Sequence, residues 1–444
     1  MRRNLHAALC GTYLAVAAGA HLVALQPAGT RGTAYIALHL ALTGLMLGVW
    51  VAGRGLPDAP RWALWTGVAA HVLLLAVPSF TSHDVLRYLW DGHAVLAGAD
   101  PYLVAPAAAE WIEGWPRPPD NLDYPTLYPP GALSLFALAA AAGPRLGPWV
   151  FQAMVLVAAL AILAWGARLL RERGAGGHVA LLALSPLLLL EAQVGAHVDV
   201  FATAALVGAL LLYHRRRWAW AGAVLGLGGL IKLVPLVVVL PLALAAGTGG
   251  VPLALASAGT VAAGYGIALA AGLEPLGSLP VFFSEWDFGS PVFAALASVL
   301  QEDSSARLVL GGMAIGAYGA ILISVRRGAG LRGARWALVV PLVLSPVVFP
   351  WYLIPLVPLI AWNPSAAFLG WLTAVPLTYE VLDRFEVGEG WVPRLWPLVG
   401  IAGAWGIGLL VDAVRARRSA PDAAAVVPPR VPVRNAGRLS EDVG

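Results

Sequence analysis

Four side chains that could bind or act on a polar ligand lie within one short stretch, Ser82–Gly92. Asp84, Arg87, Tyr88 and Asp91 are spaced i, i+3, i+4 and i+7, so they share one face if the stretch is helical. Two carboxylates beside a guanidinium and a phenol can hold a polar ligand. Asp84 is the favoured general base, and Asp91, further along the same face, is its competitor. The alternative is that the aromatic rings of this stretch only anchor it at a membrane interface.

A second group of ionisable residues lies in Glu191–Asp199, between two apolar runs. Ionisable groups within apolar segments are rare and are often functional, so we predict that Glu191, His197 and Asp199 contact the substrate. Glu191 and His197 could instead form a satisfied structural pair. His197 and Asp199 could also ligate a metal, but two ligands at this spacing are weak evidence. We therefore predict no metal site and no cofactor, with a divalent metal left open.

Lys232 is the only lysine in a chain that has 27 arginines. It has about ten apolar residues on each side, and Gly228, Gly229 and Pro235 interrupt a helix there. A compact ammonium at a helix break could hold an anion such as phosphate. The alternative is that the side chain only reaches out of the apolar region to the interface.

Aromatic residues gather in three further motifs that contain proline. The motifs are Gly98–Tyr102, Tyr124–Gly131 and Ser345–Tyr352. We predict that four of their side chains bind substrate by stacking on a sugar or by contacting a lipid phosphate, although membrane-interface belts also use such residues. These four are Tyr102, Tyr128, Trp351 and Tyr352.

The elements that position these residues are membrane-spanning helices. Of the 444 residues, 59% are hydrophobic and 12% are charged, whereas soluble domains carry about 25% charged residues. Runs such as Trp149–Ala167 and Val251–Gly272 carry no charge and are long enough to cross a bilayer as helices. Strands of a membrane barrel alternate apolar and polar residues, whereas these runs are apolar throughout. The fold class is therefore all-α, a polytopic integral membrane protein.

Arginine clusters between the apolar runs indicate which loops are cytoplasmic. Placing all clusters on that side predicts about fourteen helices (thirteen possible), with both termini cytoplasmic. The predicted helices are 5–25, 34–52, 62–80, 149–167, 178–194, 199–213, 218–231, 233–246, 251–272, 307–325, 335–349, 351–362, 365–382 and 395–414.

This topology makes residues 1–414 a single membrane domain whose outer catalytic loop is 81–148. Residues 131–143 are apolar but short, so we interpret them as an interfacial or re-entrant helix. Acidic residues collect in the outer segments 81–130 and 273–305. The tail, 415–444, is predicted to be a cytoplasmic extension that is largely disordered.

Composition also excludes several classes of partner. One cysteine, Cys10, rules out a disulfide framework. The formal net charge of +4 reflects the loop arginines, so no nucleic acid partner is predicted. The lipid bilayer is the partner that composition requires. We found no glycine loop of the kind that binds nucleotides.

Taken together and in this order, the motifs resemble a known enzyme family. They are Asp84–Gly92, Gly98–Tyr102, Tyr124–Gly131, Glu191–Asp199, Lys232–Pro235 and Ser345–Tyr352. The chain resembles the polyprenol-phosphate-mannose-dependent mannosyltransferases and their glycosyltransferase-87-like relatives, which are integral membrane glycosyltransferases of the GT-C type.

The resemblance implies inverting transfer of a sugar, with mannose favoured, from a polyprenyl-phosphate donor to a glycan or lipid-linked acceptor. It implies a multi-pass protein of the cell membrane whose active site faces the non-cytoplasmic side, with Asp84 at the position of the catalytic acid. The chain departs from the family at Ala99-Asp100, where relatives often have an asparagine, and at Ala196–Val198. It also carries two helices before the one that leads into the Asp84 loop.

Two other classes compete with this interpretation. A transporter or flippase for a lipid-linked or anionic substrate would use Lys232 and Glu191 as a coupling site near the bilayer midplane. A non-catalytic lipid-binding protein could also keep the fold. We favour the enzyme because the ionisable residues lie towards one face.

Overall fold

The computed structural model describes residues 1–109 and 115–419, and these residues fold almost entirely into helices. Within them, extended pairing is limited to isolated bridges that join Phe288 and Gly289 to Val347. The predicted all-α class is confirmed. The α-helices are α1 Arg2–Ala17, α2 Gly19–Ala24, α3 Arg31–Ala52, α4 Ala59–Leu73, α5 Asp84–Leu96, α6 Pro130–Ala140, α7 Gly143–Glu172, α8 Val179–Ala183, α9 Pro186–Gln193, α10 Asp199–His214, α11 Trp218–Gly229, α12 Val239–Ala246, α13 Gly250–Ala270, α14 Leu279–Glu285, α15 Pro291–Leu300, α16 Asp303–Ser324, α17 Leu331–Leu344, α18 Val357–Trp362, α19 Ala366–Ala374, α20 Glu380–Phe385 and α21 Leu395–Ser419.

Six stretches of these helices are long and apolar enough to cross a membrane, and the bent pair α8 and α9 would make a seventh. The protein is therefore a helical membrane protein, but the predicted count of about fourteen spans is not confirmed. Helices form at the other predicted positions, and several are short or broken. For example, α10 and α11 are only 16 and 12 residues long, shorter than the ~20 residues that a perpendicular span needs.

The stretch Val234–Ala270 meets the length test as one unit, yet the chain reverses within it. Gly247 has a left-handed φ of 59° between α12 and α13. A Cβ atom at Gly250 would lie 2.1 Å from the carbonyl oxygen of Ala243. In one continuous helix, two residues seven positions apart would be separated by about 10 Å. The two helices are therefore separate elements, as the sequence predicts for 233–246 and 251–272.

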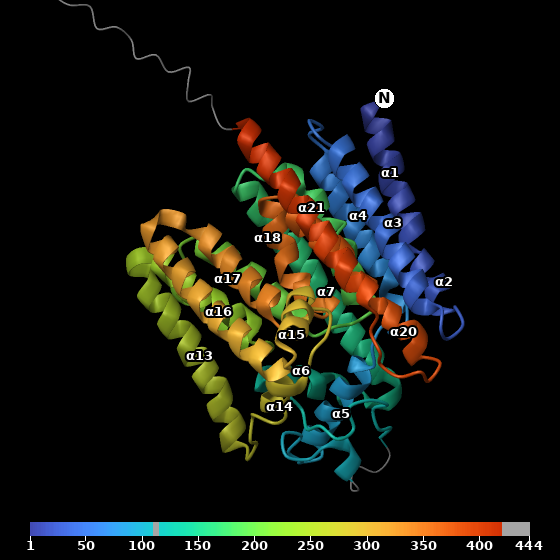
Figure 1. Cartoon of the computed structure of the whole chain (residues 1–444), viewed down its shortest axis with the longest axis vertical. Helices are drawn as coiled ribbons and strands as arrows, with labels where there is room; N and C mark the ends of the chain where they lie inside the picture. The colour runs from blue at the N-terminus through green and yellow to red at the C-terminus, as the bar shows by residue number, and fades with distance from the viewer. Residues whose placement is uncertain (110–114, 420–444) are drawn as a thin grey trace, which may run out of the picture.

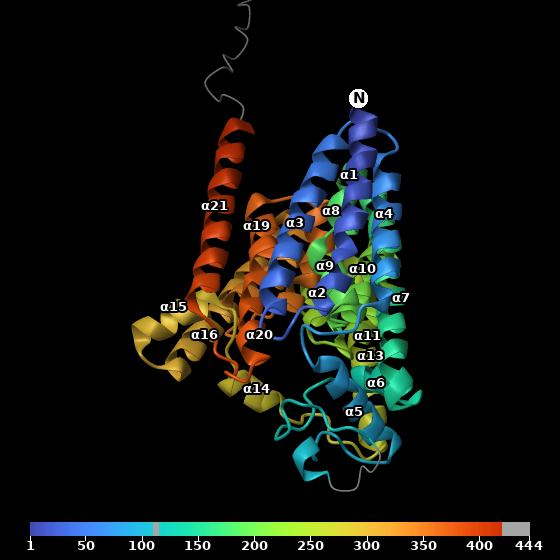
Figure 2. The same cartoon turned by 90° about the vertical axis from the view of Figure 1, so that its right-hand side faces the viewer.

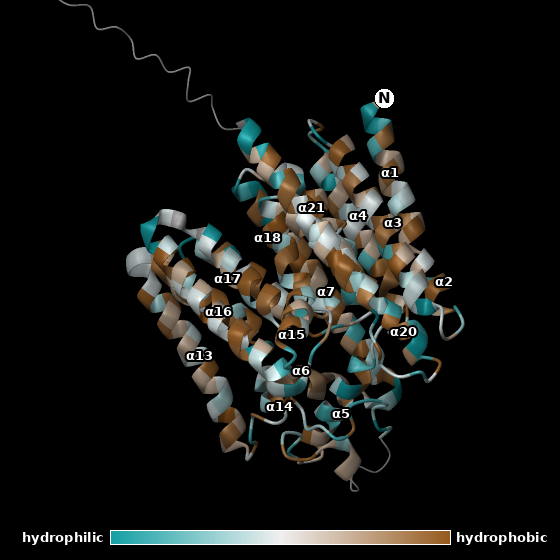
Figure 3. Cartoon of the chain, in the orientation of Figure 1, coloured by the Kyte–Doolittle hydropathy of each residue, from teal (hydrophilic) through white to brown (hydrophobic). Residues whose placement is uncertain are grey.

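The two ends of the molecule differ in what they carry. The first helix begins and α21 ends at the same end, whereas α5, α14 and the start of α6 lie at the opposite end (Figures 1 and 2). Hydrophobic residues dominate the helices between them, and hydrophilic residues gather in the loops around α5 (Figure 3). Helix α5 of the first acidic segment and α14 of the second thus share one end, which we call the loop end.

The short apolar segment predicted at 131–143 is helix α6, which is eleven residues long and packs against α5. A Cβ atom at Gly92 would lie 2.3 Å from the carbonyl carbon of Phe136, so only glycine permits this crossing. One turn earlier, the Tyr88 ring stacks on Phe136 with centroids 4.5 Å apart. This contact fixes the N-terminal turn of α5, where Asp84 lies.

A buried connection between α9 and α10 carries the second group of ionisable residues. A Cβ atom at Gly195 would lie 2.4 Å from the His197 ring, so the backbone approaches the imidazole closely. Ala196 between them is left-handed, with φ of 51°, a conformation that costs a non-glycine residue free energy.

Glu110 and Glu113 of the first acidic segment and most of the predicted tail lie outside the described residues.

Candidate active site

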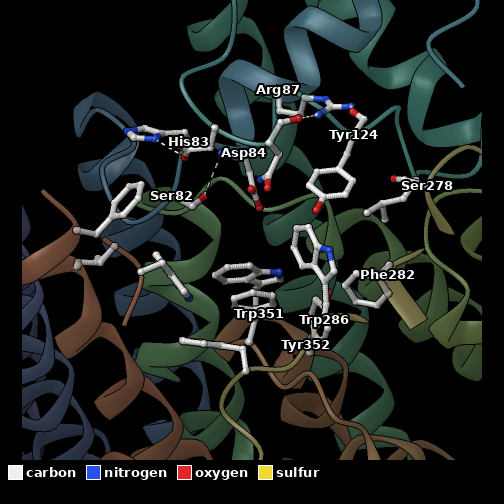
Figure 4. A pocket seen from close by; sticks show the side chains of 18 of the residues that line it. Ser82, His83, Asp84, Arg87, Tyr124, Ser278, Phe282, Trp286, Trp351 and Tyr352 are labelled. Carbon is white, nitrogen blue, oxygen red and sulfur yellow. Dashed lines mark hydrogen bonds and ion pairs between the residues drawn. The ribbon is translucent and has the colours of Figure 1, made fainter. Parts of the chain in front are cut away.

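A cavity of about 970 Å³ opens at the loop end, and six of the predicted site residues line it (Figure 4). They are Asp84, Arg87, Tyr128, Lys232, Trp351 and Tyr352. The other six, Tyr88, Asp91, Tyr102, Glu191, His197 and Asp199, are buried behind its wall, and each contacts a lining residue directly or through one neighbour. Residues from six distant motifs therefore form one site.

Asp84 begins α5, and its carboxylate points into the cavity towards Trp351 (Figure 4). Its Oδ2 lies 3.3 Å from Nδ1 of His197 and accepts a hydrogen bond from the Tyr88 hydroxyl at 3.3 Å. Burial alone would raise the pKa of Asp84, but the His197 contact and the Lys232 charge outweigh it and hold that pKa below its ordinary value. The side chain is 27% exposed, so an ionised carboxylate remains open to a ligand.

His197 is fully buried between two carboxylates. Its Nε2 lies 3.3 Å from Glu191 Oε2, on the side of the ring away from the Asp84 contact. The ring stacks on the Trp351 indole with centroids 3.9 Å apart. Glu191 also accepts hydrogen bonds from Tyr35 at 2.8 Å and from Tyr379 at 2.7 Å. This chain of contacts fixes the imidazole and thereby orients Asp84.

Lys232 lies in the break between α11 and the 3-10 turn Val234–Val238. The Ala132 amide donates to the Leu230 carbonyl at 3.1 Å and ties the end of α11 to the start of α6. The ammonium donates to Asp199 Oδ2 at 3.1 Å and lies 4.6 Å from the Tyr352 ring centroid. An ammonium has three donors, so this arrangement leaves donors for an anion in the cavity.

Arg87 is largely engaged by the protein. Its Nε donates to Asp91 Oδ1 at 2.9 Å, and its two terminal nitrogens donate to the carbonyls of Asn121 and Tyr124. The guanidinium therefore fastens the loop that follows residue 120 to α5. The Tyr102 hydroxyl donates to the Tyr128 carbonyl at 2.7 Å and braces the same loop from the other side.

Several cavity residues were not among the predicted site residues. Phe282 and Trp286 come from the second acidic segment, where the prediction noted only the carboxylates, and Trp286 packs edge-on to Tyr124 at 6.0 Å (Figure 4). The signal in the sequence that could have identified them is the presence of aromatic residues in an outer loop.

His83 also lines the cavity. It pairs with Asp120 at 2.6 Å, and this hydrogen bond raises the pKa of His83.

The geometry combines a base, a cation and aromatic surfaces in one cavity at a membrane end. An ionised carboxylate can take a proton from a hydroxyl, and an ammonium nearby can stabilise a phosphate that leaves. Within the described residues, no group of three or more histidine, cysteine, aspartate or glutamate side chains is arranged to hold a metal ion.

Comparison with known families identifies the chemistry of this arrangement. The MptA_B family, described as the N-terminal domain of alpha-(1->6)-mannopyranosyltransferases, matches residues 6–248, more than half of the chain. The chain belongs to this mannosyltransferase family. The matched region includes Asp84, His197 and Lys232 and ends before Trp351. No curated protein and no solved structure matches the chain.

Membership agrees with the resemblance that the motifs indicated, a GT-C type glycosyltransferase. The protein is therefore an enzyme that uses a sugar donor and an acceptor. The family assignment also favours the enzyme over the transporter and the non-catalytic lipid-binding protein.

Proposed function

We propose that the protein transfers mannose from a polyprenyl-phosphate donor to a hydroxyl group of a glycan or lipid-linked acceptor, with inversion at the anomeric carbon. The observation that carries this proposal is that Asp84 and Lys232 line the same cavity at the end of a membrane bundle. A donor whose lipid remains in the bilayer can present its phosphate and sugar there. We place the protein in the cell membrane as a multi-pass protein with this cavity on the non-cytoplasmic side, and the arginine distribution supports that side.

In the proposed reaction, Asp84 accepts the proton of the acceptor hydroxyl while that oxygen forms a bond to the anomeric carbon. The bond between the anomeric carbon and the phosphate oxygen breaks, and polyprenyl phosphate leaves with the electron pair. Lys232 stabilises the phosphate as its charge develops. Because the ammonium already contacts Asp199, it is held in place before the donor arrives.

His197 and Glu191 support the base in this scheme and do not themselves react. His197 contacts the same Asp84 oxygen as Tyr88, so the carboxylate has a fixed orientation. The departure at Ala196–Val198 concerns the neighbours of the histidine, and His197 itself lies next to the base in this chain. The stacked Trp351 closes the cavity floor beside the imidazole and offers a sugar an apolar face.

The family description suggests the product. We propose the α-(1→6) linkage that the family name prints. Inversion to an α product requires that mannose be β-linked to phosphate in the donor.

The test is to incubate purified protein with radiolabelled mannose attached either to polyprenyl phosphate or to a nucleotide, with and without a chelator. Transfer from the lipid-linked donor alone is expected. Asp84→Asn is nearly isosteric, and it should lower turnover by at least ~10²-fold while donor binding is kept. Asp91→Asn should cost less turnover, since Asp91 is buried against Arg87. Transfer from the nucleotide sugar, or normal turnover by Asp84→Asn, would refute the assignment.

A further inference from the structure

A second cavity, of about 400 Å³, lies at the end of the molecule opposite the active site, where the first helix begins (Figure 1). It lies among the start of α1, the end of α3, the start of α4 and the turn before α8. His6, Trp50, Arg54, Gly177 and His178 are among the residues that line it. The proposed transfer reaction does not use this cavity.

The lining is basic on one side. Arg54, His6 and His178 come from three separate segments, and the lining contains no carboxylate. The Arg54 guanidinium lies over the Trp50 ring at 4.5 Å and, within the described residues, makes no ion pair. An arginine without a counter-ion, in a lining free of carboxylates, favours an anionic ligand.

The imidazoles are held in place by the fold. His6 is 3% exposed, and the His178 ring lies edge-on to Trp50 with centroids 5.9 Å apart. Nδ1 of His178 lies 3.1 Å from the Ala361 carbonyl oxygen, so Nδ1–H donates there, and Nε2 of the neutral ring is left to accept a hydrogen bond from a hydroxyl group of a ligand. These contacts keep the cavity open and preformed.

The position of the cavity along the helices indicates the kind of anion. Arg54 follows the candidate span Arg31–Ala52 by two residues, and His178 lies in the first turn of the bent pair of helices. Trp50 is one turn inside the span, where tryptophan commonly lies at membrane interfaces. The cavity therefore lies at the level of lipid head groups, and a phosphate reaches it from the bilayer.

We propose that this cavity binds the phosphate of an anionic lipid head group. Arg54 contacts the phosphate, the His178 imidazole accepts a hydrogen bond from a hydroxyl group of the attached alcohol, and Trp50 packs against the glycerol. The site is independent of the active site, because the two cavities share no lining residue, and the start of α1 lies at the opposite end of the molecule from α5 (Figure 2).

The test measures how many lipids the intact purified protein retains, by native mass spectrometry in detergent supplemented with phosphatidylglycerol or phosphatidylcholine. The wild type should retain phosphatidylglycerol preferentially, and Arg54→Ala combined with His178→Ala should lower its apparent affinity at least ~10-fold. Arg61→Ala is the matched control, because Arg61 is a nearby arginine that does not line the cavity.

A second variant tests the cavity without removing a charge. Gly177 lines the cavity and a Cβ atom there meets no heavy atom within 4 Å, so Gly177→Leu adds an apolar side chain at the cavity without a clash at Cβ, and it should also lower retention. Gly11→Leu, on a similarly open face of α1, should not. Equal retention of both lipids, or unchanged retention in both cavity variants, overturns the proposal. So does an Arg54-dependent site that takes inorganic phosphate but not phosphatidylglycerol.

Discussion

In the proposed reaction Lys232 attracts a phosphate although its ammonium already contacts Asp199. These two roles predict how its variants behave. The side chain is 16% exposed and lies against Tyr352. Lys232→Ala should weaken donor binding by roughly 1.5–3 kcal/mol, about 10- to 100-fold, because a charge-assisted hydrogen bond is lost. Lys232→Arg should restore binding only in part, since a planar fork does not reproduce a compact charge.

Donor affinity is measured by titrating the purified variants with polyprenyl-phosphate mannose. Unchanged affinity and turnover in Lys232→Ala would mean that the residue only anchors the chain at the interface.

The pH dependence of transfer reports on His197. In the wild type, the pKa of Asp84 is lowered, so the base stays ionised and is lost only as the pH falls below its ordinary value of about 4. Burial raises the pKa of Asp84, and the His197 contact opposes that effect. In His197→Gln the imidazole is replaced by an uncharged amide, so the pKa of Asp84 should rise. The acidic limb of kcat/KM against pH should then move towards neutral pH. A limb that does not move would mean that His197 leaves the base unaffected.

At this scale, the sequence predicted which residues lie near one another better than how they pair. The i, i+3, i+4, i+7 spacing correctly placed Asp84, Arg87 and Tyr88 on one helical face. The contact between Asp84 and His197 joins residues far apart in the chain, and no local pattern encodes it. Tyr35 and Tyr379, which hold Glu191, were missed because a single tyrosine in an apolar helix resembles an interfacial anchor.

The crossing of α5 and α6 is the element-scale feature on which the site depends. Gly92→Ala would bring a methyl group within 2.3 Å of the Phe136 backbone, so the helices must separate. Because a shift of about 1 Å at a reacting group can cost 10²-fold, turnover should fall about that much. Gly11→Ala, at an open position of α1, is the control. Equal turnover of the two purified variants would contradict this role for the crossing.

Helix positions were more predictable than helix lengths. Apolar runs located the long helices and the short α6, because a buried or lipid-facing segment must be apolar in either case. They did not locate α14 and α15, which lie in the predicted outer loop 273–305. Whether α10 or α11 crosses the whole bilayer depends on tilt and packing against neighbours, which local hydropathy does not contain.

For the whole molecule, the topology prediction stands to be tested. Reporters fused within 81–130 and 273–305 should be non-cytoplasmic, and those within 174–177, 215–217 and 328–333 should be cytoplasmic. The reason is that arginine clusters collect in the second set of loops, and such loops remain on the cytoplasmic side. A reporter at residue 105 that is active only in the cytoplasm would place the active site on the wrong side of the membrane.

The left-handed backbone of Ala196 predicts that thermal stability and turnover change in opposite directions when this residue is replaced. A residue with a β-carbon in this conformation lowers the free energy of unfolding by roughly 1 kcal/mol, and glycine would not carry that cost. Ala196→Gly should therefore raise the thermal midpoint in detergent by a few degrees. The same change frees the backbone next to His197, so turnover should fall. If the variant is both more heat-resistant and equally fast, evolution had no catalytic reason to retain the alanine.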